Sequence, residues 1–452
     1  MKTDKFFNAT YSLLIGVGLI IVGILMLVGR SGLYINIINL FILAIFFLSL
    51  KQLINYFIGK EKDKKINFIR SLINILFCFI FSLFKNVPLS ILPIVFGIYL
   101  LLSSIIKYIN GGIYLYNKTK GYVTEFFFAT IYLIISLSII FSPIKNLDNV
   151  LIILGVYVLL LGVNYIVDFI GFVMPSHVKN KVRRRIRISL PAAIEAIIPY
   201  TVLSEINYLI DKDSYDSFVF EEKKNDVEPD MEVFVHTSKR GFNRTGHVDL
   251  YYKGRVLSYG SYDDSSLKFF TMIGDGVIFT TTRDKYIPFC IEHSKKTIFA
   301  FGLKLTDKQK EKIDLAIDNI FKDLENWESP YQIALKEAEL KKRKTRVHKN
   351  KYKDYASRLY QATVAKFYKF TKGKWKKYFV VGNNCCRLAD YIVGKSGIDL
   401  LKMYGVITPG AYYEYLNREF KKKNSMVISR KIYNSKNVDK KTIKEIFRGF
   451  SR

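Results

Sequence analysis

Long apolar stretches dominate the first 175 residues and constrain the fold more than any other feature. They occupy approximately residues 9–29, 34–56, 67–84, 88–109, 124–143 and 149–173. As a helix, each is long enough to cross about 30 Å of hydrocarbon. The first follows the basic flank MKTDK, as in a signal peptide, but its core is too long for one and no A-x-A-like cleavage site follows. We therefore expect six retained transmembrane helices.

Charge divides the chain into two parts. The 452 residues include 69 Lys and Arg against 39 Asp and Glu. Only 14 basic and 6 acidic residues precede residue 175, which leaves 55 basic and 33 acidic residues after it. This division predicts an all-α membrane domain at 1–175, a basic juxtamembrane connector at 176–227, an α+β domain at 228–420 and a charged, peripheral tail at 421–452. A lysine-rich helical insertion is expected near 328–377.

The short loops predict the orientation in the membrane. Lysines gather in the loops on one side, together with HVKNKVRRRIR after the sixth stretch; they are Lys2, Lys5, Lys60, Lys62, Lys64, Lys65, Lys118 and Lys120. The opposite loops hold only Arg30, Lys85 and Lys145. Because basic loops stay in the cytoplasm, we expect a multi-pass protein of the cell membrane with both termini and the soluble half cytoplasmic.

Small residues recur seven positions apart in three of the apolar stretches, at 16–23, 97–104 and 155–162. That spacing puts them on one helix face, where they let backbones approach closely in lipid. Such faces favour packing within the chain and would also suit a homo-oligomer. The pattern resembles the HdeD-like family over roughly residues 8–175. The resemblance implies a six-helix bundle in a bacterial membrane, often linked to stress or acid tolerance, with no catalytic residues to carry over.

Arginines and lysines crowd residues 179–187, where they would lie against the anionic headgroups of the inner leaflet. The apolar stretch that follows contains Pro191 and Pro199 and is too interrupted for a seventh span. It could be an interfacial helix or could pack on the soluble domain. Membrane lipids are thus expected partners of this chain.

The second half changes its periodicity. Five stretches rich in Val, Phe, Tyr and Thr predict strands, at 232–238, 246–254, 255–262, 276–283 and 296–305. Residues 305–327 predict a helix with Thr306 as N-cap. These elements indicate an α+β domain with an antiparallel sheet.

Two adjacent cysteines in GNNCCRLADYIVGKSG form the candidate reactive site. Cys385 stands where Asn384 could cap a helix, so the helix dipole would lower the pKa of its thiol. A nucleophilic thiolate also needs a nearby imidazole, and His247 opens the predicted strand GHVDLYY after a glycine. We expect the thiols to be reduced, since four cysteines in a chain of this length make no disulfide framework.

The sequence GHVDLYYKGRVLSYG, followed far downstream by NNCCRLADYI, resembles the circularly permuted NlpC-type, papain-like superfamily, which includes lecithin retinol acyltransferase-like proteins. The resemblance covers about residues 228–420. It implies Cys385 as nucleophile and His247 as base, with Asn384 and Cys386 beside them. Cys386 is a competing thiol. The family often places a polar residue on the next strand, which indicates Ser258 as the orienting residue; His236 and Asp263 are the alternatives.

Other interpretations remain open at this point. A strand histidine is usually structural and a buried cysteine pair is usually part of a core. Cys290-x-x-His293 with Cys385 or Cys386 would supply three zinc ligands but has no partner pair, so we expect neither metal nor cofactor. The basic run 341–346 would suit lipid better than nucleic acid in a membrane-tethered domain, so no nucleic acid is expected.

The predicted function combines these features. A cysteine hydrolase or acyltransferase anchored in the membrane would act on an amide or ester, carried by a lipid, an acylated protein or a peptide, at the cytoplasmic face. The alternative is a membrane sensor or scaffold that uses the papain-like fold only for binding.

Overall fold

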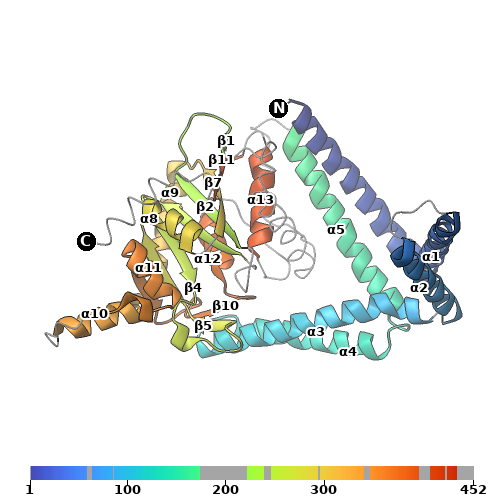
Figure 1. Ribbon diagram of the computed structural model, residues 1–452, viewed down its shortest axis with the longest axis horizontal. Coiled ribbons are helices and arrows are strands. Elements are labelled where there is room, and N and C mark those ends of the chain that lie inside the picture. The colour runs from blue at the N-terminus through green and yellow to red at the C-terminus, as the bar shows by residue number, and fades with distance from the viewer. Residues whose placement is uncertain are drawn as a thin grey trace. The chain divides into compact units, whose positions relative to one another are not determined.

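The computed structural model divides the chain into two compact units (Figure 1). Unit 1 comprises Met1–Ile109 and Val123–Ile170, and unit 2 comprises Asn110–Tyr122 and Gly171–Arg452. The structure describes residues 2–58, 64–84, 86–173, 221–238, 246–293, 296–340, 347–396, 408–422 and 425–434. Most of the predicted connector and the basic run 341–346 therefore lie outside the described residues.

The N-terminal part is helical. Its elements are α1 (Lys2–Ile58), α2 (Lys64–Leu83), α3 (Asn86–Tyr116), α4 (Tyr122–Phe141) and α5 (Leu147–Val173). Arg30, with φ 42° and ψ −139°, interrupts α1 between the first two predicted stretches. Within the described residues, Leu13–Ile58, Asn86–Tyr116 and Tyr122–Phe141 are long and apolar enough to cross a membrane, whereas Phe68–Leu83 and Leu147–Val163 are shorter apolar helices. Membrane association is thus supported by three candidate spans.

Two of the three predicted small-residue faces, at 16–23 and 155–162, pack against each other inside unit 1, whereas Gly97 of the third lies against Ile140 of α4. A Cβ added at Gly162 of α5 would lie 2.9 Å from the carbonyl oxygen of Gly16 in α1. Two helical turns further along α1, a Cβ added at Gly23 would lie 2.9 Å from the carbonyl oxygen of Gly155 in α5. Only glycine allows the two backbones to approach so closely. These faces are therefore buried between α1 and α5 of the same chain.

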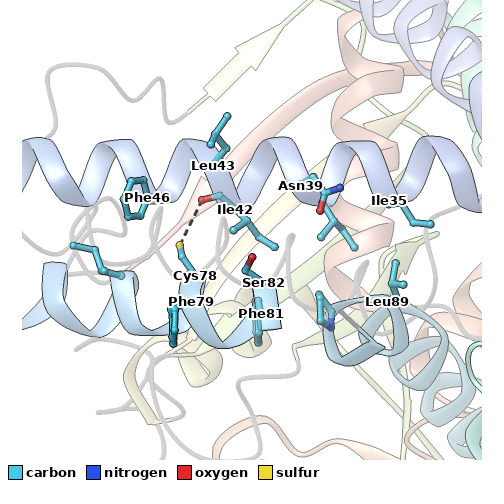
Figure 2. A pocket seen from close by; sticks show the side chains of 13 residues that line it. Ile35, Asn39, Ile42, Leu43, Phe46, Cys78, Phe79, Phe81, Ser82 and Leu89 are labelled. Carbon is cyan, nitrogen blue, oxygen red and sulfur yellow. Dashed lines mark hydrogen bonds between the residues drawn. The ribbon is translucent and has the colours of Figure 1, made fainter. Parts of the chain in front are cut away.

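A pocket of about 570 Å³ opens between the second half of α1, α2 and the start of α3 (Figure 2). Its lining is mostly apolar and includes Ile35, Phe46 and Phe79. Cys78 lines it as well, and its thiol donates to the carbonyl oxygen of Ile42 at 3.4 Å. Cys78 thus has the packing role expected of a cysteine in an apolar helix.

Unit 2 is built on an antiparallel sheet of nine described strands, in the order β1-β11-β7-β2-β3-β4-β6-β9-β8. The strands are β1 (Glu221–Lys223), β2 (Met231–Ser238), β3 (His247–Tyr252), β4 (Arg255–Gly260), β6 (Val277–Thr281), β7 (Lys296–Leu303), β8 (Leu324–Trp327), β9 (Lys366–Phe370) and β11 (Val427–Tyr433). A second, two-stranded sheet joins β5 (Ile273–Asp275) to β10 (Lys377–Phe379). The predicted α+β class with an antiparallel sheet is confirmed.

Helices cover both faces of the large sheet. On one face, α9 (Asp307–Phe321), α12 (Cys385–Val393) and α13 (Pro409–Lys421) share a core with Val233 of β2. On the other, α8 (Arg283–Pro288) and α11 (Tyr355–Thr363) share a core with Phe234. Successive side chains of a strand point to opposite faces, so adjacent residues of β2 belong to different cores.

Three boundaries differ from the sequence prediction. Residues 427–433, expected in a peripheral tail, form β11, which pairs with both β1 and β7. Residues 324–327, expected at the end of a helix, form β8 and pair with β9. The lysine-rich insertion contains α10 (Pro330–Leu340) and α11 as expected, but it also supplies β9. In each case a short strand forms because it pairs with a strand that is distant in sequence.

Candidate active site

Cys385 occupies the first position of α12, as the sequence predicted. The side chain of Asn384 caps this helix: its oxygen accepts from the backbone N–H of Arg387 at 2.9 Å, and its Nδ2 donates to the carbonyl oxygen of Val380 at 2.9 Å. The cap fixes where the helix begins, and so places the thiol at the positive end of the helix dipole. Because α12 packs against β3 and β4, this end lies beside the start of β3.

The thiol of Cys385 is buried among polar groups. It receives hydrogen bonds from the His247 ring and from the backbone N–H of Val248. The Tyr378 hydroxyl lies 3.9 Å from its sulfur and the Cys386 sulfur 4.0 Å away. Burial alone would raise the pKa of Cys385, but the hydrogen bond from Cys386 and the positive charge of His247 hold it well below its usual value. The site therefore favours the thiolate.

His247 lies in a cluster of acceptors and hydroxyls. Its Nε2 is 2.8 Å from Oδ1 of Asp249, 2.9 Å from Oγ of Ser258 and 3.2 Å from the Tyr262 hydroxyl. Burial would lower the pKa of the imidazole, but the negative charges of Asp249 and then Cys385 raise it to about 10. At neutral pH the ring is therefore protonated and forms an ion pair with both groups.

Asp249 is the fully buried carboxylate that organises the site. It bridges two imidazoles, since its Oδ2 lies 2.7 Å from Nε2 of His236, and Oδ2 also accepts from the Tyr286 hydroxyl at 2.5 Å. Burial would raise the pKa of Asp249, but the charges of His247 and His236 hold it well below its usual value. The carboxylate thus remains ionised.

Sequence reasoning missed Asp249, although the signal was present. It lies two positions after His247 on the strand HVDLYY, and residues i and i+2 of a strand project to the same side. Histidine and aspartate at this spacing can therefore form an ion pair within one strand. The sequence prediction considered orienting groups only outside the strand that contains His247, and Asp249 lies on that strand.

The other predicted partners have different positions. Ser258 is close to His247, but its hydroxyl is shared with Tyr262 at 2.6 Å. His236 pairs directly with His247 across β2 and β3, and it contacts Asp249. Asp263 forms an ion pair with Lys369 at 2.7 Å. Of the three candidates for the orienting role, only Ser258 touches the imidazole within hydrogen-bond distance.

Both cysteines of the doublet lie in the core that contains Leu388 and Ile392 of α12, and Cys386 is fully buried there. Cys385 is the one that accepts from the His247 ring and from the backbone N–H of Val248. The zinc alternative is not assembled, because Cys290 belongs to the core on the opposite face of the sheet. Within the described ranges, no three His, Cys, Asp or Glu side chains come together as metal ligands.

Comparison of the chain with protein-family models, with curated proteins and with solved structures returned no match. The site is therefore characterised by its own geometry. The buried thiol of Cys385, at the start of α12, contacts the imidazole of His247 at the start of β3, which in turn contacts the carboxylate of Asp249.

Proposed function

We propose that this protein is a membrane-anchored cysteine hydrolase or acyltransferase in which Cys385 is the nucleophile. The observation that carries the proposal is the continuous line of contacts from Cys385 to His247 to Asp249, in which the pKa of the thiol is lowered and that of the imidazole is raised. A preformed thiolate–imidazolium pair is the resting state that nucleophilic cysteine catalysis needs.

The first half of the reaction would form a thioester. The Cys385 thiolate attacks the carbonyl carbon of an amide or ester, and the carbonyl electron pair moves to oxygen. When the tetrahedral intermediate collapses, the C–N or C–O bond breaks and the His247 imidazolium gives its proton to the leaving amine or alcohol. Asp249 keeps its charge throughout and holds the imidazole in place, since it remains ionised beside two histidines.

The second half would release the acyl group. Neutral His247 removes a proton from water or from an acceptor hydroxyl or amine, which attacks the thioester and restores the thiolate. Tyr378 is placed to donate to the oxyanion: its hydroxyl is 3.9 Å from the Cys385 sulfur. Burial, followed by the charge of Cys385, raises the pKa of this phenol well above its usual value, so it stays a donor at neutral pH.

The finer architecture belongs to the same proposal. We take unit 2 as a permuted papain-like domain, because a histidine that opens a strand faces a cysteine that opens a helix. We take the N-terminal helices as an HdeD-like set of six spans, with both termini in the cytoplasm. The lysine-rich loops support this orientation, which would bring the site to lipids, acylated proteins or peptides at the inner leaflet.

Burial of the thiol favours a second candidate, a binding domain without turnover. Cys385 is only 4 % exposed and Cys386 is fully buried, so a substrate can reach the sulfur only if neighbouring groups move. In that case the ion pair would serve the stability of unit 2, and the chain would act as a membrane sensor or scaffold.

Thiol labelling separates the two candidates. A small uncharged electrophile should alkylate Cys385 of the full-length protein in detergent faster than Cys290 or Cys78, which serve as internal references. His247→Ala should abolish this difference while Ser258→Ala should largely keep it. Equal, slow labelling of all four cysteines would refute the enzyme and favour the scaffold.

Two further measurements define the reaction and its side of the membrane. A mass increase on the Cys385 peptide after incubation with membrane extract would identify the acyl group that the thiol carries. Single cysteines introduced at positions 60–65 should be labelled only in inverted vesicles. Labelling from outside intact cells would refute the cytoplasmic orientation.

A further inference from the structure

A short hairpin in unit 2 presents two phenylalanines to solvent. Phe269 is 72 % exposed and Phe270 is 88 % exposed, which is unusual for large apolar side chains outside the N-terminal helices. We refer to residues 268–273 as the Phe hairpin. Lys268 and Ile273 close it with two backbone hydrogen bonds, of 2.8 and 3.2 Å. The aromatic pair therefore sits at the tip of a closed, hydrogen-bonded loop.

The backbone of the tip is held in an uncommon conformation. Phe269, Phe270 and Thr271 have φ values of 50°, 51° and 68°, three consecutive non-glycine residues in the left-handed region. Bulky and β-branched side chains rarely adopt it, and such strain tends to occur at functional sites. Because both rings are exposed, their burial contributes little to folding that would offset this strain.

Basic residues surround the base of the Phe hairpin. The segment 366–377 contains six lysines and no acidic residue. It leads into β10, which begins at Lys377 and pairs with β5 directly after the hairpin. Three carboxylates pair with lysines of this segment: Asp275 with Lys369 and Lys377, Asp263 with Lys369, and Asp323 with Lys372. An exposed aromatic tip beside a basic segment is complementary to an anionic lipid surface.

The same basic segment lies beside the end of an apolar helix. Asn110–Tyr122, which includes the last turns of the candidate span α3, belongs to unit 2 by its contacts. The ammonium groups of Lys376 and Lys377 lie 5.6 and 5.5 Å from the centre of the Tyr116 ring, the last residue of α3. Within unit 2, the lysines at the start of β10 therefore lie against the segment in which the candidate span α3 ends.

The Phe hairpin is also connected to the candidate nucleophile. The carbonyl oxygen of Met272 accepts from the backbone N–H of Val380 at 3.0 Å. The carbonyl oxygen of Val380 in turn accepts from Nδ2 of Asn384, the cap of the helix that Cys385 begins. Two hydrogen bonds thus link the tip to the residue before the thiol.

We propose that the Phe hairpin inserts into the acyl-chain boundary of the anionic leaflet, so that the substrate of Cys385 is an acyl group carried by that bilayer. Insertion itself depends only on the exposed aromatic pair and the lysines. The substrate class rests on the function proposed above.

Insertion can be measured without catalysis. Phe270→Trp in the full-length protein, reconstituted in vesicles of phosphatidylcholine and phosphatidylglycerol, should add a blue-shifted emission over the wild-type background. Acyl-chain-brominated lipids should quench this added emission. The matched control is Leu315→Trp, at a residue that is 62 % exposed on the polar helix α9, and it should be neither shifted nor quenched. Added emission from Phe270→Trp that matches this control overturns the proposal. A blue shift that vesicles do not cause, and that appears only when another protein is added, overturns it as well.

Two further variants complete the test. Lys374→Gln with Lys376→Gln should reduce quenching of the Phe270→Trp variant to its level in phosphatidylcholine alone. Phe269→Ser with Phe270→Ser should keep wild-type labelling of Cys385 by a soluble electrophile and lose turnover of acyl lipids in vesicles. Equal, slow labelling of all four cysteines in the wild type would refute the enzyme and leave insertion standing. Undiminished turnover of vesicle lipids by the double serine variant would refute the role in substrate uptake.

Discussion

Asp249 determines the charge state of the candidate site. Its carboxylate lies between the imidazoles of His247 and His236, and it also accepts a hydrogen bond from Tyr286. In a fully buried position, an ionised carboxylate persists only where it is paired. Because it keeps its charge, Asp249 raises the pKa of His247 to about 10, and the protonated ring then stabilises the Cys385 thiolate.

Asp249→Asn should therefore slow the alkylation of Cys385. The amide keeps the size of the side chain but removes the negative charge, so the imidazole loses its proton more readily and the thiolate loses its counter-ion. If the line of contacts acts catalytically, turnover should fall by about 10²- to 10⁴-fold, the range typical of a positioned acid or base. The rate of alkylation as a function of pH checks this, and an unchanged profile would contradict the role of Asp249.

The same groups predict how stability depends on pH. The pKa of His247 is raised on folding from 6.5 to about 10, so its contribution is fully present below pH 6.5 and is lost as pH rises through about 10. The pKa of Asp249 is lowered, so its contribution is present above its unfolded pKa and is lost as pH falls through the folded one. Thermal unfolding of wild type and His247→Gln should therefore differ most just below pH 6.5, where both contributions are present, and converge above pH 10. A gap that widens there would refute the ion pair.

At the scale of single elements, the start of α12 matters most. The nine-residue helix begins where Asn384 caps it, and its first residue is the candidate nucleophile. Alternation in HVDLYY and the polar residue before CCRLADYI let the sequence predict both β3 and α12. Interactions between distant segments were not accessible in the same way. Strand β8 forms because it pairs with β9, and β11 forms because it pairs with β7. The sequence of each strand alone does not reveal these partners.

Asn384→Ala should remove the cap of α12 and weaken the effect of the helix dipole on the Cys385 thiol. Loss of the cap should cost about 1 kcal/mol of unfolding free energy and should raise the pKa of Cys385, which alkylation at mildly acidic pH would detect as a slower rate. Asp354→Ala is the matched control, because Asp354 caps α11 through the N–H of Ser357 at 2.8 Å. It should lower stability by a similar amount and leave the alkylation of Cys385 unchanged. Equal effects on alkylation would show that the cap acts only through stability.

At the scale of the whole molecule, the chain joins a unit of apolar helices to an α+β unit. Two of the predicted small-residue faces pack α1 on α5, and the candidate site is built entirely from residues of unit 2. The homo-oligomer that such faces would also suit remains a prediction, and it would need a different surface from the one that α1 and α5 bury against each other.

Gly162→Ala should destabilise unit 1 and spare the site. The new Cβ would meet the carbonyl oxygen of Gly16 and the backbone nitrogen of Ile20, both at 2.9 Å, so α1 and α5 would have to separate. Overpacking of this kind costs about 1–3 kcal/mol. Gly18→Ala is the control, since its Cβ would meet nothing within 4 Å. Thermal unfolding in detergent should fall only for Gly162→Ala, with Cys385 alkylation unchanged in both; altered alkylation would show that the units are coupled.

The sequence by itself determined the apolar helices, the antiparallel strands, and Cys385 and His247 as the candidate reactive pair, because periodicity, helix caps and residue chemistry are local properties. Only the tertiary structure identified Asp249 as the shared carboxylate, excluded Asp263 from the imidazole, put Cys290 in a separate core, and brought β11 into the sheet. These outcomes depend on which distant segments pack together, since burial and pairing set both the charge of a buried group and the partners of a short strand.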